Sequence, residues 1–153
     1  MFGRRYVLSV TLAALVAVAA CSGDSETPTE PTPPPPTGPS TMQVTELVDG
    51  TGTEAASGNS VFINFTVWRY DPAGADSKGN LLGTSVGGTP YSFQVGSTST
   101  IAGISQGTIG MKVGGKRRLI VPPSLAYGTS GSSDGSIRPN EWLVFEIELL
   151  SVV

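Results

Sequence analysis

Near its C-terminus the chain reads Trp142-Leu143-Val144-Phe145-Glu146-Ile147-Glu148-Leu149-Leu150, which is its clearest strand pattern. Apolar residues alternate along it with two glutamates. Because successive side chains of a strand point to opposite faces of a sheet, the pattern predicts a strand with one face in the core and one in water.

Four other segments predict strands. Val61–Trp68 is rich in β-branched and aromatic residues, and its apolar side chains recur at every second position. Arg117–Val121 is shorter and is followed by two prolines, which cannot continue a central ladder. Weaker patterns predict strands at Gln43–Val48 and Ser92–Val95.

The segment Thr100–Met111 lies between these strands and has no clear pattern. It carries apolar residues but also Gly103, Gly107 and Gly110, and each glycine costs a helix about 1 kcal/mol relative to alanine. Helix propensity therefore does not predict a stable helix here. Several strands with at most one short helix indicate the α+β class, with a sheet folded over one apolar element.

The N-terminal segment has the parts of an export signal. Met1–Arg5 is basic, Tyr6–Ala17 is mostly apolar, and small residues directly precede Cys21. The apolar run is shorter than the about 20 residues that a spanning helix needs. A cysteine at this place resembles the acylated residue of bacterial lipoproteins; an ordinary signal peptide and an uncleaved anchor are the alternatives. Serine at position 22, directly after the cysteine, resembles the pattern of lipoproteins kept in the outer membrane. We therefore expect an exported protein that is lipid-anchored to the outer membrane and faces the periplasm.

Proline and threonine dominate the segment Ser22–Ser40. Consecutive prolines favour the extended polyproline II conformation, so we expect a spacer. A proline-rich ligand for a partner protein is the alternative. The predicted organisation is a signal peptide at 1–20, a lipidated cysteine with its linker at 21–41, and one domain at 42–153, which is a typical domain size.

Composition excludes several kinds of chemistry. The chain has no histidine, and its one cysteine is Cys21. A histidine-assisted nucleophile, a zinc site and an internal disulfide are therefore not predicted, and we expect no metal and no cofactor. The net charge of −3 becomes −5 once Arg4 and Arg5 are removed with the signal peptide. This acidic balance argues against nucleic acid as a partner.

Five blocks of the chain together resemble the FKBP-type peptidyl-prolyl isomerases. They are Pro90–Gly96, Ile101–Gly103, Met111–Arg117, Val121–Gly128 and Ile137–Leu150. The similarity covers essentially all of 42–153. It implies a twisted antiparallel sheet of about five strands wrapped around one short helix, near Ala102–Ile109.

The resemblance also implies an aromatic-lined active site. Catalytic roles fall on Tyr127, Phe65 and Phe145. Substrate-binding roles fall on Leu82, Tyr91, Phe93, Thr100, Ile101, Ile104 and Ile137. Core packing is the alternative for each of these residues, above all for Phe93 and Phe145, which lie on well-patterned strands.

Three positions depart from the family pattern. The family commonly has tyrosine at the place of Phe65, aspartate at the place of Gly83 and tryptophan at the place of Ile104. The family implies proline-containing polypeptides as substrates and macrolide inhibitors of the FKBP class as ligands. We therefore expect a membrane-tethered isomerase that assists the folding of exported proteins. The alternative is a proline-binding or chaperone-like module with weak or no isomerase activity.

Overall fold

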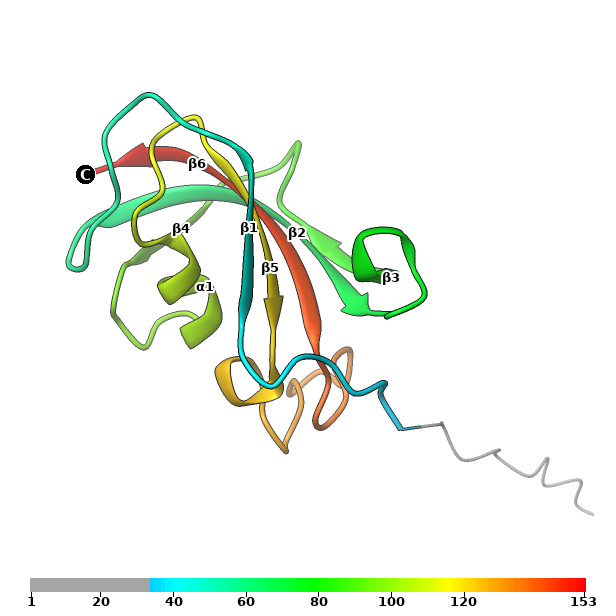
Figure 1. The fold of residues 1–153 in the computed structure, drawn as a ribbon. Coiled ribbons are helices and arrows are strands. Elements are labelled where there is room, and N and C mark those ends of the chain that lie inside the picture. The colour runs from blue at the N-terminus through cyan, green and yellow to red at the C-terminus, as the bar shows by residue number, and fades with distance from the viewer. Residues whose placement is uncertain (1–33) are drawn as a thin grey trace, which may run out of the picture. The chain divides into compact units, whose positions relative to one another are not determined.

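A computed structural model describes residues 34–153 (Figure 1). The predicted signal peptide, the predicted lipidation site at Cys21 and the first part of the predicted linker lie outside the described residues. Within residues 34–153, no helix is both long enough and apolar enough to cross a membrane.

One antiparallel sheet of six strands dominates the domain, which confirms the α+β class. The strands are β1 (Gln43–Val48), β2 (Ser60–Tyr70), β3 (Lys78–Thr84), β4 (Tyr91–Gln94), β5 (Lys116–Val121) and β6 (Leu143–Val152). Their order is β1-β5-β6-β2-β3, and β4 pairs with the first part of β2. The sheet is open and twisted, and the short helix α1 lies against one of its faces (Figure 1).

Strand β3 is the one strand that the sequence pattern does not predict. It contains two glycines and no alternation, and it pairs with β2 through two register shifts. The connection before it holds a 3-10 turn, η1 (Ala75–Ser77). Asp76 in this turn forms ion pairs with Arg118 at 2.7 Å and with Lys78 at 3.9 Å. These contacts fasten the turn to side chains of the sheet.

Helix α1 spans Ala102–Thr108, close to the range that the family resemblance implies. A β-carbon on Gly103 would lie 2.4 Å from Val121 Cγ1, and one on Gly107 would lie 2.3 Å from Leu119 Cδ1. Both distances are shorter than real contacts allow. The two glycines therefore let α1 pack directly on β5, and this packing offsets their poor helix propensity.

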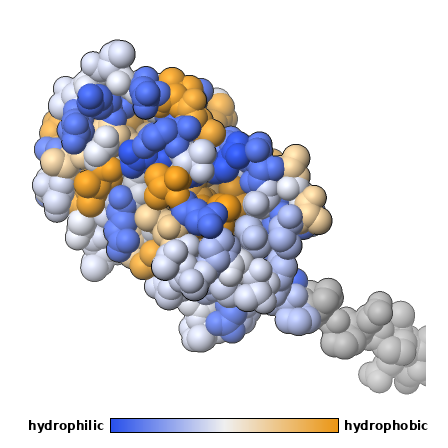
Figure 2. Space-filling view, viewed as in Figure 1, coloured by the Kyte–Doolittle hydropathy of each residue, from blue (hydrophilic) through white to orange (hydrophobic). Residues whose placement is uncertain are grey.

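The hydrophobic core lies between α1 and the sheet. Most of its fully buried side chains come from alternate positions of the long strands, among them Val61, Ile63, Leu119, Val121, Leu143, Ile147 and Leu149. Two buried polar side chains on α1 are satisfied, because Thr108 Oγ1 donates to Ile104 O at 2.8 Å and Ser105 Oγ accepts from Gly96 N at 2.7 Å. Figure 2, which has the same view as Figure 1, shows the exposed apolar residues in separate patches among polar ones.

The last part of the predicted linker touches the domain. Trp142 donates from its indole Nε1 to the Pro39 carbonyl at 3.0 Å, and Gly38 lies against the same ring. Contacts with the domain therefore begin a few residues before the predicted boundary at 42.

Candidate active site

A pocket of about 690 Å³ lies between α1 and the sheet. This volume is in the range of small-molecule sites. One wall, the sheet wall, carries Ile63, Phe65 and Val67 from β2, Tyr91 from β4 and Phe145 from β6. Ile101, Ala102 and Ile104 line the pocket from the start of α1. A second wall, the loop wall, carries Ala126, Tyr127 and Ile137 from the connection between β5 and β6. Ser97, Thr98, Ser99 and Thr100 form a hydroxyl-bearing rim.

The structure brings eight of the ten predicted site residues to this pocket. They are Phe65, Tyr91, Thr100, Ile101, Ile104, Tyr127, Ile137 and Phe145. The other two, Leu82 and Phe93, are not among its lining residues. Phe93 is buried in the core with its ring 5.7 Å from that of Tyr91, and Leu82 packs against the edge of the core from β3. Both therefore belong to the core packing and not to the pocket lining.

Aromatic rings form the centre of the sheet wall. Phe65 meets Tyr91 edge to face, with ring centroids 5.8 Å apart and an interplanar angle of 82°. Phe65 also lies 6.4 Å from Phe145. Edge-to-face and tilted pairs at these separations are the favourable arrangements for aromatic rings, so the three rings hold one another in place.

Hydroxyl groups at the end of β3 fix the backbone of Phe65. Its N–H donates to Ser85 Oγ at 2.9 Å, and its carbonyl accepts from Ser85 N at 2.9 Å and from Thr84 Oγ1 at 3.1 Å. These bonds replace regular ladder pairing where β3 ends. The Thr84-Ser85 pair therefore positions the central ring of the pocket.

Tyr127 carries a hydroxyl that can serve a bound ligand. It follows the 3-10 turn η2 (Pro123–Leu125), and 39% of its surface is exposed. Its hydroxyl makes no hydrogen bond with any residue of 34–153, whereas the Tyr91 hydroxyl donates to Ser99 O at 3.3 Å. Partial burial raises the pKa of Tyr127, with smaller contributions from Tyr91 and Asp134. The phenol therefore stays protonated at neutral pH and can donate.

The pocket has no charged lining. Its fifteen lining residues include no carboxylate, ammonium or guanidinium group. Gly83 pairs with Val67 in the β2–β3 ladder, and a β-carbon there would meet only Val67 Cγ1, at 3.9 Å. A β-carbon at position 83 would thus make ordinary contact with Val67 of the pocket wall. The uncharged lining is a property of this sequence and is not imposed by lack of space.

Sequence reasoning missed seven lining residues, which are Ile63, Val67, Ser97, Thr98, Ser99, Ala102 and Ala126. The signal for Ile63 and Val67 was present, since they share the buried face of β2 with Phe65 at period two. No comparable signal marks the serine and threonine rim, because a polar loop reads the same whether it borders a pocket or bulk water.

Comparisons with known proteins agree with this geometry. The sequence profile of the family described as FKBP-type peptidyl-prolyl cis-trans isomerase matches residues 52–150. The FK506-binding protein of Streptomyces anulatus is 37% identical over 115 residues, which cover 74% of this chain and 88% of that protein. A crystal structure of a peptidyl-prolyl cis-trans isomerase from Pseudomonas syringae pv. tomato superimposes with a TM-score of 0.59 at 32% identity, over 72% of this chain and 74% of that one.

Some relatives are much longer. The peptidyl-prolyl cis-trans isomerase FKBP53 of Arabidopsis thaliana is 36% identical over 116 residues, but these are only 23% of its length. The shared part is therefore one domain, and the roles of such longer proteins as a whole do not transfer to this chain.

Proposed function

This chain belongs to the FKBP-type peptidyl-prolyl cis-trans isomerase family, and on that premise we propose that it isomerises X–Pro bonds in exported proteins while tethered to a membrane through Cys21. Relatives named peptidyl-prolyl cis-trans isomerases support the activity. The observation that carries the proposal is the uncharged, aromatic-lined pocket, which the Tyr127 side chain also lines.

The reaction suits a pocket without a nucleophile. Rotation about an X–Pro amide is slow because the double-bond character of the C–N bond is lost at the twist, at a cost of about 18–20 kcal/mol. No bond breaks, so no acid, base or metal is required. The twisted amide is less dipolar than the planar one, so an uncharged apolar pocket favours it over the ground state, and such differential binding is catalysis.

Each wall has a task in this reaction. The rings of Phe65, Tyr91 and Phe145 form an apolar surface for the proline ring. Tyr127 lines the same pocket from the loop wall, and its hydroxyl is available to donate to a substrate carbonyl. The same apolar surface would hold a macrolide ligand of the FK506 type, which the name of the Streptomyces relative supports.

A second candidate function is a proline-binding or chaperone-like module with weak catalysis. The uncharged lining favours it, because Gly83 and Phe65 stand where the family commonly has aspartate and tyrosine. Losing a charge-assisted hydrogen bond in the transition state costs about 1.5–3 kcal/mol, or roughly tenfold to a few hundredfold in rate. We therefore propose measurable but modest catalysis.

Measuring cis–trans exchange of an X–Pro tetrapeptide with the purified full chain separates the two functions. We expect the wild-type chain to accelerate exchange over background. The catalysed rate should be about fivefold lower in Tyr127→Phe, because one neutral hydrogen bond is lost, and lower again in Tyr127→Ala. An unchanged melting temperature serves as the folding control. Peptide binding without acceleration would favour the binding module. Full activity in Tyr127→Ala would mean that the site is elsewhere.

The membrane tether is supported by sequence features outside the described residues. The basic Met1–Arg5, the apolar Tyr6–Ala17 and the sole cysteine at 21 match the arrangement of an acylated lipoprotein. Cys21→Ser should move the protein from the membrane fraction to the soluble fraction. Unchanged membrane association of this variant would contradict the lipid anchor.

A further inference from the structure

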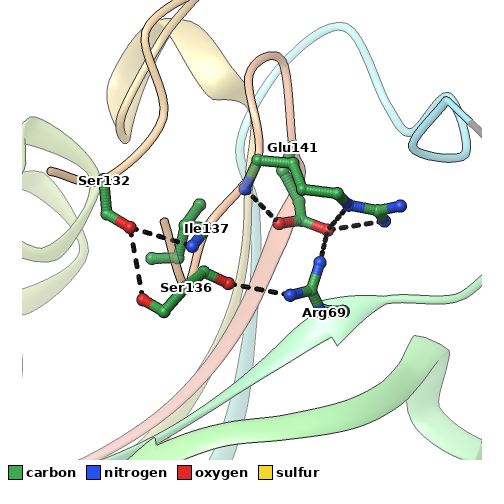
Figure 3. A network of polar contacts seen from close by, with 6 residues as sticks. Arg69, Ser132, Ser136, Ile137 and Glu141 are labelled. Atoms are coloured by element: carbon green, nitrogen blue, oxygen red, sulfur yellow. Dashed lines mark hydrogen bonds and ion pairs between the residues drawn. The ribbon is translucent and has the colours of Figure 1, made fainter. Parts of the chain in front are cut away.

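Beside the loop wall lies a buried carboxylate that the proposed reaction does not use. Glu141 is only 3% exposed. Its Oε1 accepts from Arg69 Nη1 and from Arg138 Nη2, the latter at 2.7 Å, and its Oε2 accepts from the backbone N–H of Arg138 at 2.8 Å (Figure 3). Glu141 thereby joins β2 to the segment that carries Ile137, although 72 positions separate it from Arg69.

A gain in stability is a weak explanation for the burial of Glu141 and its arginine partners. Removing a carboxylate and a guanidinium from water costs several kcal/mol for each ion, and apolar residues of similar volume are often at least as stabilising. What an ion pair adds is geometry, because Arg and carboxylate groups bond in fixed directions. The geometric role of these charges therefore depends on which part of the pocket they hold in place.

Around Ile137 the backbone is held at four successive polar groups. The Ser136 carbonyl accepts from Arg69 Nη2 at 2.7 Å. The Ile137 N–H donates to Ser132 Oγ at 2.8 Å, and the Ile137 carbonyl accepts from Ser132 N at 3.0 Å. The Arg138 N–H donates to Glu141. No helix or strand includes this segment, so these bonds take the place of a regular ladder.

Arg69 connects the two walls directly. It lies on β2, the strand that carries Phe65 and Val67 into the pocket, and its guanidinium reaches both Glu141 and the Ser136 carbonyl. Ile137, which directly follows Ser136, lines the same pocket. The Arg69 guanidinium and the Glu141 carboxylate thus tie the segment that carries Ile137 to β2.

We propose that Glu141 and Arg69 are positioning residues, which fix the Ile137 wall at the distance from β2 that suits the substrate. The inference rests on the proposed isomerase function, because it assigns these residues a part in that site. Neither residue lines the pocket, so they act through Ile137.

Arg69→Lys in the full chain tests this proposal. Lysine keeps a positive charge for the buried Glu141, but its single ammonium cannot hold Glu141 and the Ser136 carbonyl in one fixed geometry. A looser wall weakens ground-state and transition-state binding alike, which raises KM and leaves kcat unchanged. We expect KM for an X–Pro tetrapeptide, and the Kd for the same peptide, to rise about three- to tenfold, as for the loss of one hydrogen bond. Glu141→Gln should act in the same direction.

The matched control is Arg118→Lys. Arg118 also bridges two acceptors, Glu146 at 2.9 Å and Asp76 at 2.7 Å, but it does not line the pocket or contact the Ile137 segment. It should leave KM and Kd unchanged. Amide hydrogen exchange at Ile137 and Arg138 should become faster in Arg69→Lys and not in Arg118→Lys.

The outcomes separate this inference from the proposed function. A lower kcat with unchanged KM and Kd, or equal effects of Arg69→Lys and Arg118→Lys, would show a merely structural role and overturn the inference. If the wild-type chain binds the peptide without accelerating exchange, the proposed function fails, while Kd still decides the inference. If it neither binds nor accelerates, both fail.

Discussion

The sheet wall and the loop wall of the pocket are held in place by different kinds of contact. Phe65, Tyr91 and Phe145 on the sheet wall are held by ring contacts, core packing and strand pairing. Ile137 on the loop wall lies outside regular secondary structure. Its N–H donates to Ser132 Oγ, and the neighbouring backbone accepts from Arg69 at the Ser136 carbonyl and donates to Glu141 from the Arg138 N–H.

Because the two walls are held differently, they should respond differently to substitutions. Close packing tolerates little change in volume, because protein interiors are as dense as organic crystals. A polar network tolerates changes of shape better but depends on each partner. A buried polar group that loses its partner destabilises the fold by its full desolvation penalty. Substitutions in the sheet wall should therefore act through volume or added charge, and substitutions in the loop wall through the loss of a single bond.

The largest effect should come from adding polar groups to the sheet wall. Phe65→Tyr combined with Gly83→Asp introduces the hydroxyl and the carboxylate that the family commonly has there, and position 83 has room for a side chain. A charge-assisted hydrogen bond that acts in the transition state should raise kcat/KM for X–Pro exchange roughly tenfold to a few hundredfold.

Each single variant is the control for this pair. Phe65→Tyr alone buries a hydroxyl without its carboxylate partner, and Gly83→Asp alone places a carboxylate beside an apolar wall, so both should lower the melting temperature. A double variant no faster than the wild-type chain would show that the uncharged lining does not limit catalysis.

A change of volume under the helix should act mainly on stability. Gly107→Ala improves helix propensity by about 1 kcal/mol, but its β-carbon would meet Leu119 at 2.3 Å. Overpacking of this kind costs about 1–3 kcal/mol, so we expect a net loss in the free energy of unfolding, measured with urea.

Gln106→Ala is the control in the same helix, because Gln106 is exposed. It should change stability by no more than about 0.5 kcal/mol. Gly107→Ala should also be less damaging when Leu119 is shortened to valine. A Gly107→Ala chain more stable than the wild type would mean that α1 can move away from β5 without cost.

Much of the sheet could be predicted from alternation alone, because β2, β5 and β6 bury one face. The helix could not, since the reason for Gly103 and Gly107 lies in side chains of β5. Strand β3 was missed because its glycines and irregular pairing leave no period. The family resemblance, and not periodicity, supplied most of the pocket residues.

The polar half of the site was out of reach of sequence reasoning. Arg69 and Glu141 are far apart in the sequence, and each alone reads as an exposed charge. Their pairing depends on where the connection before β6 folds back onto β2. A local pattern carries no information on that contact.

The smallest expected effect concerns an exposed carboxylate behind the loop wall. Asp134 Oδ1 accepts from the hydroxyls of Ser132 and Ser136 and from Ser136 N, which holds the Ser132 hydroxyl where it accepts from Ile137 N. The hydrogen bond from Ser132, with those from Ser136, lowers the pKa of Asp134 from 3.8 to about 2. Asp134→Asn keeps an acceptor oxygen but cannot titrate.

Because the pKa of Asp134 is lower in the folded chain, the unfolded chain binds more protons between pH 4 and pH 2, and the stabilisation present above pH 4 is lost as the pH falls through about 2. The melting temperature of the wild-type chain should therefore exceed that of Asp134→Asn by a constant amount above pH 5, and the difference should shrink toward pH 2. Glu146, whose pKa is lowered by Lys78 and Arg118 despite the opposing effect of burial, titrates in both chains and cancels from the difference. The change should be small, since Asp134 is exposed and solvent screens its charge. A difference that stays constant down to pH 2 would show that the charge of Asp134 does not help to hold the loop wall, and the network around Ile137 would then depend on Arg69 and Glu141 for its ionic part.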